Sequence, residues 1–245
     1  MKKKFAVCFS GYPRFVKKTF QSIKENFLDG LGNYDIYANL QWNKDWKTTQ
    51  IHHAFTDTFE DDELQDFVDL YTHLNLQKIQ VNDPYVFDVS NYNVLSSDPH
   101  LQQCDLELCR DIYYRTKSQY QGIADCIRII DNVNDYDYFI RVRTDLIFEK
   151  KLNFENFESD VIINQSGYCA GWDRPFCDWF FITPKQQLQF YNDLSKVEEH
   201  HKNGIVAMHS LVETIGNPYG IKHQEFNIGV PLSTNYLGEL FKKRK

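Results

Sequence analysis

The sequence has no apolar run long enough to cross a membrane, which takes about 20 consecutive apolar residues in a helix. The lysines at residues 2–4 lead into a short apolar stretch of strand length, which is not the core of a signal peptide. We therefore expect a cytoplasmic protein without a membrane span. The basic residues at 2–4 and 242–245 are expected to keep the termini soluble, with weak contact to an anionic membrane surface as the alternative.

A basic excess is also missing, because the net charge is −7 and the pI is about 5.6. This argues against a nucleic-acid-binding protein, which presents a dominant basic face. Binding of small anionic ligands is still possible, since a few arginines close together are enough to bind a phosphate. The phosphate-binding loop GxxxxGK[ST] is absent as well.

The six cysteines form no CxxC pair. Cys8 and Cys126 lie in apolar patterns, so reduced structural thiols are expected in place of disulfides or a zinc site.

Short apolar runs alternate with segments of helical periodicity along the 245 residues. This alternation predicts an α/β fold with a mostly parallel sheet in the first two-thirds of the chain and a mixed sheet afterwards. Strands are expected at residues 5–9, 34–42, 78–81, 138–142, 161–164 and 179–183, with a last edge strand at 223–228. Helices are expected at residues 15–28, 60–74, 106–133 (with a break near Thr116), 184–194 and 205–215. Loops are expected at residues 43–57 (including His52 and His53), 82–103 and 165–177.

The stretch at residues 136–148, YDYFIRVRTDLIF, carries unusual charge for a buried strand. The strand ends in Arg141, Arg143, Thr144 and Asp145, and charge is costly there unless a ligand or a partner compensates it. Open α/β sheets bind ligands at the carboxyl ends of their strands, so this position predicts a ligand site. Strand alternation places Arg141 and Arg143 on one face, where both could meet one anion. The alternative is a structural ion pair between Asp145 and one arginine.

The first strand runs into the loop Ser10-Gly11-Tyr12-Pro13-Arg14, after which a helix begins. Such a loop offers backbone N–H groups, and Arg14 near the helix start could meet a phosphate. The alternative is an ordinary strand-to-helix turn with a surface arginine.

Four segments in the same order, AVCFSGYPRF, YDIYANLQW, RTKSQYQGIADCIRII and YDYFIRVRTDL, resemble a group of viral and bacterial glycosyltransferases. These have the GT-A fold and are linked to surface-glycan or lipopolysaccharide synthesis. The resemblance covers about residues 5–195. It implies a three-layer α/β/α sandwich with a central mixed, mostly parallel sheet, forming one domain over residues 1–245. Residues 1–145 would form the nucleotide-sugar-binding half and residues 146–245 the acceptor-binding half.

The same resemblance implies a metal-binding Asp-x-Asp triplet, which here reads Arg143-Thr144-Asp145. Only Asp145 matches, so a Mn²⁺ or Mg²⁺ ion at Asp145 is one expectation. The other is that arginine replaces the metal, because its charge repels a divalent cation and itself neutralises a diphosphate.

The implied function is transfer of a hexosyl or deoxyhexosyl group from a nucleotide-diphosphate sugar to a glycan hydroxyl. The residues expected to contact the donor are Ser10, Gly11, Arg14, Lys117, Ser118, Gln121, Arg141, Arg143 and Asp145.

Asp178 is the first candidate for the general base and Asp173 the second, with a strand-end carboxylate that caps an N–H group as the alternative for Asp178. Trp172, His209 and Glu213 are candidate acceptor contacts. The alternative for His209 and Glu213 is a solvated helix face.

Two other functions compete with glycosyl transfer. One is a non-catalytic nucleotide- or glycan-binding α/β module that keeps the pocket and lacks the base. The other is a nucleotidyl or phosphoryl transferase, which also uses arginines and a carboxylate.

Overall fold

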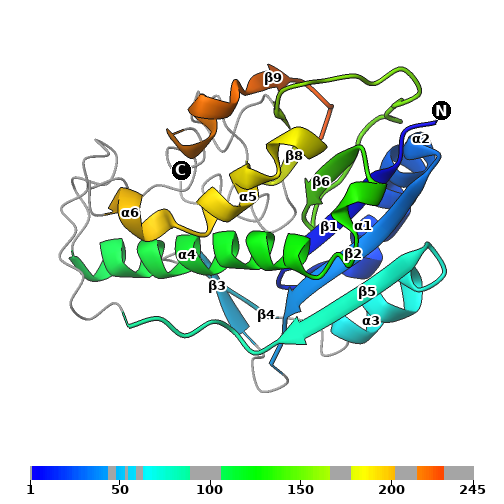
Figure 1. Cartoon of the computed structure of the whole chain (residues 1–245). Helices are drawn as coiled ribbons and strands as arrows, with labels where there is room; N and C mark the ends of the chain where they lie inside the picture. Colours follow the sequence, from blue (N-terminus) through cyan, green and yellow to red (C-terminus); the bar gives the residue numbers. More distant parts are fainter. Residues whose placement is uncertain are drawn as a thin grey trace, which may run out of the picture.

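The computed structural model describes residues 2–43, 48–52, 55–58, 63–88, 106–165, 178–201 and 214–228. Within these residues the main sheet has seven strands in the order β5-β2-β1-β6-β8-β7-β9 (Figure 1). The strands are β1 Phe5–Gly11, β2 Tyr34–Gln41, β5 Leu76–Asn82, β6 Tyr138–Val142, β7 Ile163–Gln165, β8 Phe180–Pro184 and β9 Lys222–Gln224.

The four strands β5, β2, β1 and β6 run parallel, whereas β8 is antiparallel to β6 and to β7. β1 and β6 are buried along almost their whole length, because strands in the middle of a covered parallel sheet are apolar on both faces. The mixed, mostly parallel sheet predicted from the sequence is therefore confirmed. The register brings Val142 of β6 opposite Phe180 of β8, so β8 begins at the edge where the parallel strands end.

Helices cover both faces of the sheet, which gives three layers (Figure 1). One face carries α1 Val16–Ser22, the π-helical segment η1 Ile23–Leu28, α2 Asp29–Leu31 and α3 Glu63–Tyr71. The other carries α4 Leu106–Arg128, α5 Gln189–Leu194 and α6 Val197–His201. Short 3-10 turns lie at η2 Val133–Asp135, η3 Lys185–Gln187 and η4 Asn217–Tyr219.

Strand alternation divides the apolar side chains of β1 between two core layers. Phe5, Val7 and Phe9 pack in the core under α1 and α3, whereas Ala6 and Cys8 pack in the core under α4 and α5. Cys8 and Cys126 are buried free thiols.

The prediction of a loop at residues 43–57 is wrong, because β3 Thr48–His52 and β4 Phe55–Thr58 form a separate antiparallel pair of strands. Its threonines and isoleucine favour extended backbone, although the segment is too polar to show a strand pattern. His52 is a strand residue, and His53 lies outside the described residues.

The helix expected over residues 106–133 ends earlier, at Arg128, and runs unbroken through Thr116. The Asn132 side chain accepts a hydrogen bond from the Asn134 backbone N–H, which favours a turn over further helix. The last strand, β9, is an edge strand as predicted but ends at Gln224. Most of the expected helix at 205–215 lies outside the described residues.

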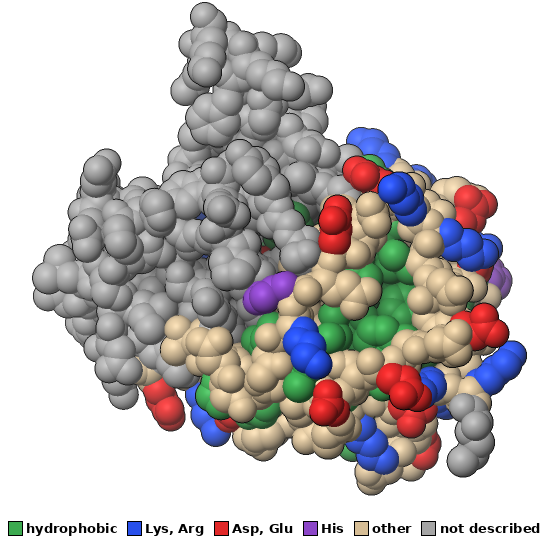
Figure 2. Space-filling view, turned by 90° about the horizontal axis from the view of Figure 1, so that it is seen from above, with side chains coloured by type: hydrophobic (Ala, Val, Ile, Leu, Met, Phe, Trp, Pro, Cys, Tyr) green, Lys and Arg blue, Asp and Glu red, His purple; other side chains and the backbone are tan. Residues whose placement is uncertain are grey.

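None of the described helices is both long and apolar enough to span a membrane. On the face shown in Figure 2, lysine and arginine side chains are interspersed with aspartate and glutamate around a hydrophobic patch.

Gly30 lies where a side chain would collide with the backbone. A Cβ atom built there would be 2.1 Å from the Leu152 carbonyl oxygen, whereas one at Gly122 in α4 would be 3.6 Å from the nearest atom. We predict that Gly30→Ala lowers the free energy of unfolding by about 2 kcal/mol or more, because the backbone must shift. Gly122→Ala is the matched control and should be neutral or stabilising by ~0.5–1 kcal/mol. Urea unfolding measures both, and equal stability of the two variants would contradict this packing.

Candidate functional site

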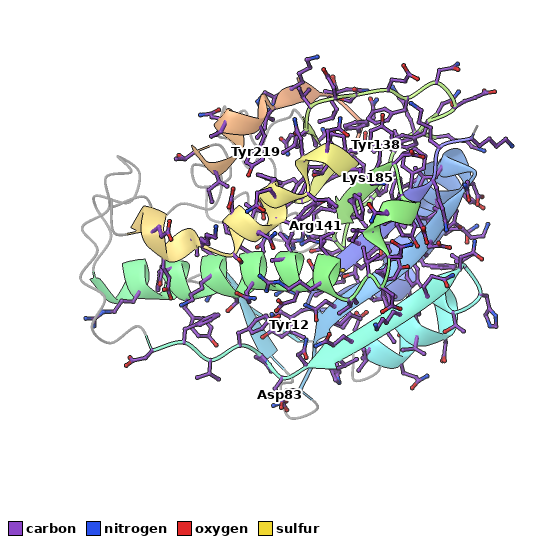
Figure 3. All side chains as sticks on the ribbon, in the orientation of Figure 1. Tyr12, Asp83, Tyr138, Arg141, Lys185 and Tyr219 are labelled. Carbon is purple, nitrogen blue, oxygen red and sulfur yellow. The ribbon has the colours of Figure 1, made fainter. Side chains whose placement is uncertain are left out.

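Polar side chains gather where the parallel strands end and β8 begins. Ser10, Arg141, Asp145 and Asp178 are each at most 5% exposed, although they carry charge or a hydroxyl. Figure 3 shows Arg141 near the centre of the molecule, in the region of β6 and α4. Since the carboxyl end of a parallel sheet is where open α/β folds bind ligands, this edge is the candidate site.

Arg143 and Asp145 form a two-point ion pair just beyond β6. Arg143 Nε donates to Asp145 Oδ1 at 2.8 Å, and Arg143 Nη2 donates to Asp145 Oδ2 at 2.7 Å. The Asp145 side chain is 2% exposed and that of Arg143 is 20% exposed. Charge-assisted, parallel hydrogen bonds of this kind fix the plane of the guanidinium group. The ion pair that the sequence left as an alternative is thus present, with Arg143 as its cationic partner.

Arg14 lies in electrostatic contact with this pair. The pKa of Arg14 is lowered to about 10, first by burial and then by repulsion from Arg143, while attraction by Asp145 opposes the shift. A smaller lowering comes from Arg115 of α4. Because the pKa remains well above 7, Arg14 is cationic at neutral pH.

Arg141 reaches the same cluster from within β6. Its pKa is also lowered to about 10, first by burial and then by repulsion from Arg143, while Asp178 and Asp145 raise it. Its Nε–H has no hydrogen-bond acceptor among the described residues. Arg14 and Arg141 thus each lie within electrostatic reach of Arg143 and Asp145. That the three arginines bind an anion stays a prediction.

Thr144 joins the loop after β1 to the turn after β6. The Arg14 backbone N–H donates to Thr144 Oγ1 at 3.0 Å, and Thr144 Oγ1 lies 3.3 Å from the Tyr12 carbonyl oxygen. The Thr144 carbonyl accepts a bond of 2.5 Å from Thr19 Oγ1 in α1. These contacts fix Arg14 and Arg143 relative to each other.

Glu63 holds the other side of the same loop. Its Oε1 and Oε2 atoms accept bonds of 2.8 Å each from the backbone N–H groups of Phe15 and Val16. These donors lie at the start of α1, where helix geometry leaves N–H groups without intrahelical partners. Phe15 has a left-handed backbone (φ 53°), and Gly11 has φ 101°, which glycine adopts more readily than other residues.

Asp178 is 1% exposed and lies in the turn just before β8. Its Oδ2 accepts a hydrogen bond from the Gln119 side chain of α4. Its charge also contributes to raising the pKa of Tyr120, after burial. The candidate base thus lies on the α4 side of the arginine cluster, within electrostatic reach of Arg141.

The described side-chain contacts of Lys117 and Gln121 are with groups outside the arginine cluster. Lys117 pairs with Glu198 of α6, and its Nζ lies 4.3 Å from the centre of the Phe87 ring. Gln121 donates to Asp125 at 2.9 Å. The remaining α4 candidate, Ser118, accepts a 3.5 Å bond from Gln41 through its backbone carbonyl.

Four further candidates, Trp172, Asp173, His209 and Glu213, lie outside the described residues, so their roles stay predictions.

The described surroundings of Asp145 do not suit a metal ion. Both of its carboxylate oxygens accept hydrogen bonds from Arg143, so a cation there would lie directly beside a guanidinium charge in a side chain that is 2% exposed. The described part of the chain also contains no group of three His, Cys, Asp or Glu residues arranged to hold a metal ion.

Sequence reasoning gave no role to Glu63, Thr144 or Gln119. Glu63 lies near the start of the helix expected over residues 60–74, and nothing in the sequence pairs it with Phe15, 48 residues away. Thr144 was visible as part of the polar cluster, but its contact with Arg14 spans 130 residues.

No protein-family model matches the sequence, and a search of curated proteins returns no match. Among solved structures, the fold is similar to the glycosyltransferase GlyE of Streptococcus pneumoniae TIGR4, with a TM-score of 0.48 and 13% identity. The apo form of GlyE gives a TM-score of 0.48 and 12% identity. The alignments cover 100% and 99% of this chain but 50% of GlyE, so the chain spans about half its length. The functional argument therefore rests on the site itself.

The contacts of Glu63 predict a specific loss of stability. Glu63→Gln replaces one acceptor oxygen with an NH₂ group that faces a backbone N–H, so the free energy of unfolding should fall by ~1–3 kcal/mol. Glu155→Gln, at an exposed turn residue, is the matched control and should change stability by less than ~0.5 kcal/mol. Chemical denaturation compares the two, and an unchanged Glu63→Gln variant would contradict this role.

Proposed function

We propose that this protein is a glycosyltransferase that moves a sugar from a nucleotide-diphosphate donor to the hydroxyl of a glycan acceptor. The observation that carries the proposal is the convergence of Arg14, Arg141 and Arg143 at the carboxyl edge of the sheet. A nucleotide- or glycan-binding module and a nucleotidyl or phosphoryl transferase would use the same anion site. The choice of glycosyl transfer therefore depends on the candidate base next to that site.

The leaving group of such a reaction is a nucleoside diphosphate, whose negative charge grows as the glycosidic bond breaks. Fixed guanidinium groups stabilise that charge because they need no reorganisation at the moment of reaction. Arg143 is oriented by Asp145, and Arg14 is oriented by its loop, which contacts Thr144 and Glu63. Ser10 and Gly11 border the same edge and are proposed to approach the nucleotide.

In the proposed step, the bond between the anomeric carbon and the diphosphate oxygen breaks, and its electron pair leaves with the diphosphate. The acceptor oxygen forms the new bond to the anomeric carbon, and its proton passes to a carboxylate base. Asp178 is proposed as that base because it is a buried carboxylate within electrostatic reach of Arg141. Asp173 is the second candidate.

Acceptor contacts by Trp172, His209 and Glu213 belong to the same proposal, as do donor contacts by Lys117, Ser118 and Gln121. The Lys117 side chain would have to leave Glu198 to reach a donor phosphate.

One observation favours a second candidate, a nucleotide-binding module without transfer activity. Asp178 is 1% exposed and accepts a hydrogen bond from Gln119, so an acceptor hydroxyl reaches it only if these side chains rearrange. Slow hydrolysis of a bound nucleotide sugar separates the two, because a transferase with a working base transfers sugar to water and a binding module does not.

A thermal-shift screen with UDP-, GDP-, CMP- and dTDP-sugars tests the proposal first. Because ligand binding stabilises the folded state by mass action, a ligand at 100 times its Kd should add about 2.7 kcal/mol of stability. For a chain of this size that corresponds to a rise in Tm of about 5–10 °C. No shift with the UDP-, GDP- or dTDP-sugar would contradict the proposed function, and the CMP-sugar is the comparison with a single phosphate.

Removal of site residues should then reduce both binding and transfer. Arg143→Ala is expected to weaken binding of the donor found in the screen by about 10- to 100-fold, because a charge-assisted hydrogen bond to phosphate is lost. Arg128→Ala, at an exposed arginine of α4, is the matched control and should bind as the wild type does. Asp145→Ala should reduce transfer by leaving Arg143 without its anchor. Full transfer activity in both Arg143→Ala and Asp145→Ala would refute the site.

A further inference from the structure

The charges at the site disfavour the binding of a divalent cation. Arg143 and Asp145 act electrostatically on both Arg14 and Arg141. Arg115 also acts on Arg14, and Asp178 also acts on Arg141. With Glu63, which holds the loop that carries Arg14, the described charges at this edge sum to about +1 when each guanidinium counts +1 and each carboxylate −1. A cation approaching this edge meets repulsion, and a diphosphate meets attraction.

The geometry of Asp145 adds a second obstacle. Its two oxygens are 2.8 and 2.7 Å from Arg143 nitrogens, and the side chain is 2% exposed. A metal ion at Asp145 would have to share an oxygen that already accepts from Arg143 or displace that bond, and in either case it would lie beside the guanidinium charge. Truncating or displacing one partner of a buried ion pair is unfavourable because the other charge is left uncompensated.

We infer that the site binds the diphosphate of its donor through guanidinium groups without a divalent cation, and that Asp145 is a positioning residue for Arg143. The inference rests on the proposed function and specifies which groups neutralise the negative charge of the donor diphosphate. Arg143 suits this role because its five N–H donors lie in a fixed plane. Two of them hold Asp145, which fixes the plane of the guanidinium group at the carboxyl edge of the sheet.

Calorimetric titration tests this inference with UDP, GDP or dTDP, whichever nucleoside diphosphate has the sugar that gives the largest thermal shift. The whole chain is titrated once in EDTA and once with excess Mn²⁺. We expect the two dissociation constants to agree within about threefold. Binding that needs Mn²⁺, or that strengthens tenfold or more with it, would overturn the inference and leave the proposed function standing. If no nucleoside diphosphate bound under either condition, the proposed function would fall and the inference with it.

The variant Arg143→Asp provides the sharper comparison, because it replaces the guanidinium group with a second carboxylate two residues from Asp145. It should lose at least tenfold in affinity in EDTA and recover part of that affinity with Mn²⁺. Titration with Mn²⁺ alone, followed by electron paramagnetic resonance, should show binding to Arg143→Asp and none to the wild type at the same concentrations. Tight Mn²⁺ binding by the wild type would overturn the inference.

Two further variants guard against misfolding and general charge effects. Arg128→Asp makes the same charge reversal at the exposed end of α4, and should leave nucleotide affinity and Mn²⁺ binding as in the wild type. Arg143→Gln removes the charge without adding a carboxylate, so it should lose affinity in EDTA and recover none with Mn²⁺. Recovery in Arg143→Gln would contradict the assignment of the effect to this pair of positions.

Discussion

The ion pair of Arg143 with Asp145 is the interaction on which the site depends. Asp145 is almost fully buried, so its charge is tolerated because a guanidinium group meets both of its oxygens. The pair fixes Arg143, and Thr144 between them fixes Arg14 through its backbone N–H. A single turn of three residues after β6 thus sets the positions of two cations that come from distant parts of the chain.

The sheet supplies the remaining constraint. β1 and β6 are parallel neighbours, so their carboxyl ends lie at one edge and both loops open onto the same space. β8 runs the other way, which places its first residues at that edge and brings Asp178 toward Arg141. The topology of the sheet therefore brings the buried charges together, and burial with repulsion by Arg143 lowers the pKa of Arg14 and Arg141 to about 10.

Much of this arrangement could be predicted from the sequence, because buried parallel strands are continuous apolar runs and the charges of β6 interrupt one of them. Arg14 and Arg143 each follow a strand that the sequence predicts, and neighbouring parallel strands end at one edge of a sheet. The hairpin β3–β4 could not be predicted, since short polar strands leave no clear pattern. The contacts of Glu63 and Thr144 were missed for a different reason. They join residues 48 and 130 positions apart, and local pattern contains no information on such pairs.

The most direct test of the account is a crystal structure of the protein bound to its nucleoside diphosphate, grown with Mn²⁺ present. The account predicts phosphate oxygens within hydrogen-bond distance of Arg143 and Arg14, with Arg143 still paired to Asp145 and no metal between Asp145 and the phosphates. A diphosphate bound elsewhere would contradict the proposed site. A metal ion that bridges Asp145 and the diphosphate, with Arg143 displaced, would contradict the role given to the ion pair.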